Sequence, residues 1–143
     1  MNEQIIYKYA KMELEQFAMF EENIPLETND VQFQTGVQFS FDKDNSILCS
    51  KVVVTISQEN NPIMKIDLNN YFEIASESIN NLMQEEKIVF SPPILVQFAS
   101  LGYGAIRGIM YTKTLGTALS TFILPPIYLG NMIDNAFVVR CAL

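Results

Sequence analysis

An unbroken alternation of side-chain types from Val31 to Phe41 constrains the fold of this chain more than any other feature. Apolar residues and one threonine occupy the odd positions, and glutamine, glycine and serine occupy the even ones. Because successive side chains of a β-strand point to opposite faces, this period of two predicts a strand with one buried and one solvated face. Strands of this kind are typical of antiparallel sheets.

Two further segments extend the strand into a meander. A run of turn-forming residues from Asp42 to Ser46 follows the first strand, and a second such run extends from Gln58 to Pro62. After each turn, apolar residues return at even positions: Leu48, Val52, Val54 and Ile56 in one run, and Met64, Ile66, Leu68, Phe72 and Ile74 in the other. The pattern predicts three antiparallel strands joined by short turns.

A fourth strand is expected near the N-terminus. Ala10, Met12 and Leu14 alternate with polar residues, and the apolar positions then change phase to Phe17 and Met19. A β-bulge adds one residue to a strand and shifts the alternation in this way. We therefore expect a bulged strand with an irregularity close to Glu15.

The second half of the chain favours helices. The segment Ser76 to Gln84 has the spacing of a short helix, and Ser91 followed by Pro92 and Pro93 predicts the start of a long helix that runs toward Lys113. Gly116 is a suitable stop.

Two prolines, Pro125 and Pro126, exclude a helix from Thr121 to Ile127, so this segment is expected to be extended. Tyr128 to Asn135 is interpreted as a last short helix, and Ala136 to Leu143 has no assignment. The prediction is thus an α+β fold in which a four-stranded antiparallel sheet carries a long helix on one face and a short C-terminal helix follows. Residues 1–143 are expected to form a single domain, since this length is near the commonest domain size.

Small residues recur every fourth position in the long helix, at Ser100, Gly104 and Gly108, and so form a stripe along one side. Each glycine inside a helix costs about 1 kcal/mol relative to alanine. Close packing against another backbone can offset this cost. The stripe therefore predicts contact either with the sheet of the same domain or with the helix of a second copy, and the sequence leaves both open.

The net charge limits the kinds of partner that the protein is expected to bind, and the cysteine content indicates the cell compartment. Sixteen acidic residues against nine basic ones give a net charge of −7, which disfavours nucleic acid as a partner. Cys49 and Cys141 have no paired spacing, and Met1 to Lys11 does not resemble a secretory signal, so we expect a cytoplasmic protein. Two uncharged stretches, 88–106 and 115–133, are long enough to cross a bilayer, but their prolines argue against membrane insertion.

Catalytic and metal-binding patterns do not stand out. The chain has no histidine, which removes the usual general base and the commonest metal ligand, and it has no phosphate-binding GxxxxGK[ST] run. We therefore expect no enzymatic activity, no catalytic or metal-binding residues and no cofactor. The chain has ten phenylalanines, six tyrosines and seven methionines, so we expect it to function by apolar contact with a partner.

This order of elements resembles the SecB family of export chaperones. In that family a helix with an aromatic residue and an arginine leads into a leucine-rich loop that ends in proline, and here Tyr103, Arg107 and the segment Leu124-Pro125-Pro126-Ile127 look similar. The resemblance implies a homotetramer, built as a dimer of dimers, that holds unfolded polypeptides in apolar grooves without ATP, with protein export as one setting.

The resemblance also implies which residues bind the client. Leu124, Ile127 and Tyr128 lie in or beside the proline-containing segment that resembles the family's loop, so they are expected near the client-binding groove. Phe33 and Phe72 are added because they are expected to be exposed at strand ends. Ser100, Gly104 and Gly108 are assigned to oligomer or helix packing. An alternative hypothesis is a structural adaptor of the same fold that binds one specific partner, such as a chaperone associated with a toxin–antitoxin pair.

Overall fold

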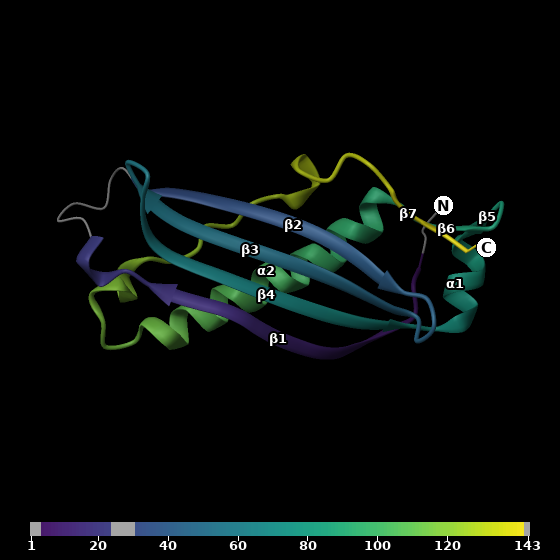
Figure 1. The fold of residues 1–143 in the computed structure, drawn as a ribbon, viewed down its shortest axis with the longest axis horizontal. Coiled ribbons are helices and arrows are strands. Elements are labelled where there is room, and N and C mark those ends of the chain that lie inside the picture. The colour runs from purple at the N-terminus through teal and green to yellow at the C-terminus, as the bar shows by residue number, and fades with distance from the viewer. Residues whose placement is uncertain (1–3, 24–30, 142–143) are drawn as a thin grey trace.

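The structure of this chain is a computed structural model that describes residues 4–23 and 31–141. Its largest element is a four-stranded antiparallel sheet with the strand order β1-β4-β3-β2 (Figure 1). The strands are β1 (Tyr7–Met19), β2 (Gln32–Asp42), β3 (Ile47–Gln58) and β4 (Asn61–Ile74). The predicted sheet is confirmed, and β1 returns to pair with β4 rather than with its neighbour in sequence.

The turns and the bulge follow from local chemistry. In the turn between β2 and β3, Asp42 Oδ1 accepts hydrogen bonds from the backbone amides of Asp44 (3.0 Å) and Asn45 (3.4 Å). Glu59 and Asn60 join β3 to β4 with positive φ angles of 49° and 68°, as a two-residue hairpin turn requires. The register of β1 against β4 shifts between Leu14 and Gln16, which confirms the predicted bulge, and it shifts a second time between Tyr9 and Lys11.

Helix α2 (Pro92–Thr114) crosses one face of the sheet at a slant (Figure 1). Ser91 occupies the N-cap position, the two prolines form the first turn, and Gly116 follows the C-cap residue with a φ of +77°. Such a left-handed glycine is a common helix terminator. The predicted start and stop of this helix are both confirmed.

The core lies between α2 and the even-numbered face of β3 and β4. One cluster joins the middle of the sheet to the second half of α2 and is closed by Leu119, Phe122, Leu124 and Leu129. A second cluster surrounds Phe72, which contacts Phe98 of α2 with ring centroids 4.5 Å apart. The opposite face of the sheet carries mainly polar side chains.

The chain ends in smaller elements. Helix α1 (Ser76–Leu82) agrees with the predicted short helix, and a three-stranded sheet of order β5-β6-β7 lies beyond it: β5 (Met83–Gln84), β6 (Lys87–Phe90) and β7 (Phe137–Arg140). The sequence did not predict this sheet, and β7 lies in the segment left without assignment, whose last two residues fall outside the described part. Where a short C-terminal helix was expected, the chain forms a 3₁₀ turn, Leu129–Asn131.

Candidate functional site

Exposed apolar side chains gather along α2 and the segment that follows it. These side chains are Leu101, Tyr111, Leu115, Ile123, Ile127, Tyr128 and Met132, and Met12 and Leu14 add to them from the edge strand β1. The exposed fractions of Ile123 (71%) and Tyr128 (70%) are among the largest. A large exposed apolar patch is a mark of binding sites. We call the outer side of α2, together with the flanking residues of 122–128 and of β1, the α2 surface.

Residues 122–128, here called the strap, run extended along α2. The Tyr103 hydroxyl donates a hydrogen bond to the carbonyl oxygen of Pro125 at 2.6 Å, and Arg107 Nε donates to the carbonyl oxygen of Leu124 at 3.2 Å. Burial raises the pKa of Tyr103, and the nearby Arg107 guanidinium opposes part of that rise. The phenol therefore stays protonated near neutral pH and remains a donor to the strap.

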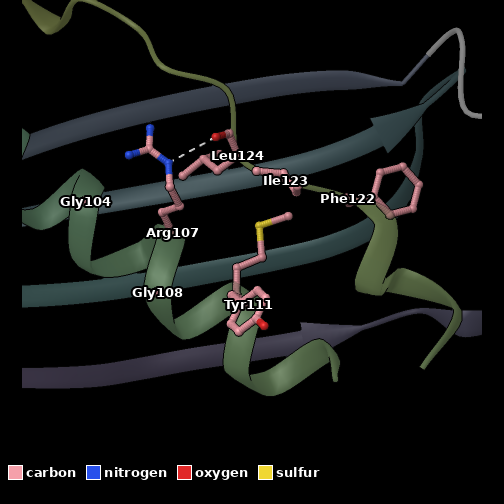
Figure 2. A pocket seen from close by; sticks show the side chains of 8 residues that line it. Gly104, Arg107, Gly108, Tyr111, Phe122, Ile123 and Leu124 are labelled. Atoms are coloured by element: carbon pink, nitrogen blue, oxygen red, sulfur yellow. Dashed lines mark hydrogen bonds between the residues drawn. The ribbon is translucent and has the colours of Figure 1, made fainter. Parts of the chain in front are cut away.

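Between the strap and α2 lies a hollow of about 420 Å³, the strap groove (Figure 2). Its lining residues are Gly104, Arg107, Gly108, Met110, Tyr111, Phe122, Ile123 and Leu124. Buried Leu124 alternates with exposed Ile123 along the strap, so the groove has an apolar floor and an apolar rim. Figure 2 shows Arg107 reaching from α2 to the strap, with its two terminal nitrogens directed away from Leu124.

A second hollow, of about 570 Å³, lies on the other side of α2 and is called the β1 groove. Its lining residues are Met12, Leu14, Leu68, Ala105, Gly108, Ile109, Thr112 and Lys113. The Lys113 ammonium group lies 5.9 Å from the centre of the Phe17 ring. Gly108 lines both grooves, so the α2 surface is continuous from the strap to β1.

The stripe of small residues faces outward on this surface. Ser100, Gly104 and Gly108 are all exposed, and a methyl group built on either glycine would meet no described residue within 4 Å. Packing among residues 4–23 and 31–141 therefore does not explain these two glycines. Gly102 differs, because a methyl group there would lie 2.5 Å from Asn70 Nδ2 and 2.9 Å from Val52 Cγ2. It is Gly102, outside the predicted stripe, that lets α2 approach the sheet.

The five residues predicted to bind the client lie in different parts of the structure and differ in exposure. The exposure expected of Phe72 is wrong: its side chain is fully buried between Tyr7, Tyr9 and Phe98, because the N-terminal half of α2 covers that end of the sheet. Phe33 is half-buried against the core. Leu124 points into the core, whereas Ile127 and Tyr128 are exposed on the strap.

Several groove residues were missed from the sequence. Ile123 carried a usable signal, since the residue beside a buried Leu124 in an extended segment must face the other way. Tyr111 carried one too, because it follows Gly108 by three residues and so shares its face of the helix. No sequence signal marked Met12 and Leu14 as groove residues, because their exposure depends on how far α2 extends over β1.

The described residues offer little for covalent or metal chemistry. Within residues 4–23 and 31–141, no three Cys, Asp or Glu side chains come together as metal ligands could. Both cysteines are free, and burial raises the pKa of Cys49, which disfavours a reactive thiolate. In the same ranges, no helix is both long and apolar enough to cross a membrane. Apart from the cations Arg107 and Lys113, the α2 surface can provide apolar contact.

Comparisons with known proteins bear on the fold. No family model matches the chain, and no curated protein matches it in sequence. Among solved structures, it is similar to the SecB-like chaperone of Mycobacterium tuberculosis in complex with a ChAD peptide from the HigA1 antitoxin, with a TM-score of 0.50 and 12% identity over 85% of this chain and 90% of the other. A Streptococcus agalactiae protein of unknown function aligns with a TM-score of 0.49 and 14% identity over 87% of this chain and 99% of the other. The chain is thus similar in fold to a SecB-like chaperone.

Proposed function

We propose that this chain is an ATP-independent holdase that binds unfolded or nascent polypeptides in the manner of SecB-like chaperones. The observation that carries the proposal is the α2 surface, where two apolar grooves meet at Gly108 beside the exposed strap residues. Methionine side chains adapt to varied apolar partners, and one methionine lines each groove, Met110 the strap groove and Met12 the β1 groove. An extended client would lie in the grooves with little preference for sequence.

Self-association is part of the proposal. A homo-oligomer, arranged as a dimer of dimers, would place the stripe of Ser100, Gly104 and Gly108 against a second copy. Gly104 and Gly108 also line the grooves, so a client that crosses α2 at Gly108 would displace this contact. The open space above both glycines supports this placement, since neither is required by packing in the part of the chain that the structure describes. Residues 1–143 would act as one domain of such an assembly in the cytoplasm, without enzymatic activity and with protein export as one setting.

A second candidate function is an adaptor for one specific protein. It is favoured by the neighbour from M. tuberculosis, which was solved with a peptide from an antitoxin. Purification of the tagged chain from a native lysate separates the two functions. A heterogeneous set of bound proteins is expected for a holdase, and one stoichiometric partner is expected for an adaptor.

Suppression of aggregation tests the holdase directly. The chain at molar excess should keep several chemically unfolded proteins from scattering light in the absence of nucleotide. Ile123→Ser should weaken this protection, because it removes the most exposed apolar side chain of the strap groove at little cost to folding. Gln38→Ser, at an exposed position on the polar face of the sheet, should leave protection unchanged. An absence of protection for every unfolded protein would refute the proposal.

A further inference from the structure

The grooves of the α2 surface carry charge of one sign only. The two charged residues of α2 are Arg107 and Lys113; Arg107 lines the strap groove and Lys113 lines the β1 groove. No carboxylate lines either groove among the described residues, although acids outnumber bases by sixteen to nine in the chain. The binding surface is therefore locally cationic on an acidic protein.

The hydrogen-bond donors of Arg107 are only partly used by its contacts with described residues. Its Nε donates to Leu124 and its guanidinium carbon lies 5.7 Å from the centre of the Tyr103 ring, and these contacts fix the side chain at the edge of the groove. Neither salt bridge found in the described residues includes Arg107, since they join Lys11 to Glu13 and Lys51 to Asp67. A guanidinium has five donor hydrogens, so the two terminal nitrogens can still bind a carboxylate in a bidentate manner.

We propose that Arg107 selects client segments in which an apolar side chain lies next to an Asp or Glu. The apolar side chain would fill the strap groove between Tyr111 and Ile123, and the neighbouring carboxylate would pair with the terminal nitrogens of Arg107. A side-chain carboxylate fits better than a chain end, because both grooves share Gly108 and an extended segment can continue across the helix. This inference rests on the proposed function and adds a sequence preference to it.

Two opposite electrostatic effects then act on a client at different ranges. A net charge of −7 attracts basic segments over a range of about 8 Å at physiological salt. Contact with Arg107 favours a carboxylate at short range, where salt screens the pair less. A preferred client is therefore basic overall and carries an acid beside an apolar residue.

The test uses labelled peptides that differ by one group. A short peptide with a Phe-Leu core, flanking lysines and a Glu next to the core is compared with the same peptide carrying Gln, each with an amidated C-terminus, by fluorescence anisotropy at physiological salt. The Glu peptide should bind about tenfold more tightly, as expected for one charge-assisted pair. Arg107→Gln should abolish the difference. Arg107→Lys should retain only part of it, because an ammonium group keeps the charge but cannot pair with a carboxylate in a bidentate manner.

Control variants and peptides keep the outcomes distinct. Lys65→Gln removes one positive charge from the opposite face of the sheet and should leave the preference unchanged. Equal binding of the two peptides, or a preference that survives Arg107→Gln, would overturn the inference and leave the holdase in place. A preference seen only with a free C-terminal carboxylate would overturn it too. Failure of both peptides to bind, together with unchecked aggregation, would overturn the holdase as well.

Discussion

Substitution of two neighbouring helical glycines by alanine should change stability in opposite directions. Gly102→Ala places a methyl group 2.5 Å from Asn70 Nδ2 and 2.9 Å from Val52 Cγ2. Asn70 cannot move away freely, since its Nδ2 donates to the Ser50 carbonyl oxygen at 3.1 Å and its Oδ1 accepts a hydrogen bond from the Tyr9 hydroxyl. Gly104→Ala places its methyl group in open space.

The magnitudes follow from these surroundings. Alanine gains about 1 kcal/mol of helix propensity over glycine at either position. At Gly102 this gain is opposed by overpacking, which costs about 1–3 kcal/mol, and by strain on a buried hydrogen bond worth about 1 kcal/mol. Gly104→Ala should therefore raise the free energy of unfolding by up to about 1 kcal/mol, and Gly102→Ala should lower it by about 1–3 kcal/mol.

Urea unfolding followed by circular dichroism measures both effects. The comparison is made at low protein concentration, so that self-association contributes equally little to each variant. Equal stability of the two variants would refute the proximity of Gly102 to the sheet. A destabilising Gly104→Ala would refute the outward direction of the stripe.

Four other perturbations have defined outcomes. Gly104→Ala combined with Gly108→Ala should lower the oligomer mass in sedimentation without unfolding the chain, and an unchanged mass would count against the stripe as a contact between copies. Asn70→Ala should lower the free energy of unfolding by about 2–3 kcal/mol, because it removes the buried hydrogen bond to the Ser50 carbonyl oxygen and the part-buried one from the Tyr9 hydroxyl, whereas Asn81→Ala at an exposed position of α1 should change little. Tyr103→Phe should speed hydrogen exchange in the strap, since it removes the bond to Pro125, and exposed Tyr111→Phe should not; equal rates would show that the hydroxyl does not hold the strap. Burial raises the pKa of Tyr103 above its ordinary value of 10.0, so the stability that its phenol contributes should be complete below pH 10 and be lost as the pH rises through the higher folded pKa. Tyr103→Phe should make the alkaline loss of stability shallower, and an identical pH profile would contradict this assignment.

The sheet was predictable because one periodicity fixes both its strands and their buried face. Val52, Val54 and Ile56 stand at alternate positions and are all fully buried under α2, as the pattern requires. The bulge near Glu15 was predictable for the same reason, since one extra residue in a strand moves every later side chain to the other face.

The small sheet could not be predicted in this way. Strand β7 pairs with β6, where Phe137 lies opposite Phe90, and each strand has four residues. So short a run carries no periodic signal, and its partner lies far away in the sequence. The contact is set by the path of α2 and the strap between them.

The candidate site was predictable only in part. The sequence marked the strap through Pro125 and Pro126, because prolines exclude a helix, but it could not give the rotation of α2 about its axis. That rotation is fixed by which residues reach the core, including Phe98, Ile106 and Met110. It directs Gly102 to the sheet and leaves Gly104 and Gly108 outside, a distinction that spacing alone does not contain.

Site-specific photocrosslinking tests most directly whether unfolded polypeptide lies on the α2 surface. A photoreactive phenylalanine analogue is placed at Ile123 in the strap groove or at Gln38 on the polar face of the sheet, and each protein is mixed with an unfolded client without nucleotide. Strong crosslinks are expected from position 123 and few from position 38. Crosslinks of equal yield at both positions, or at position 38 alone, would contradict binding on the α2 surface.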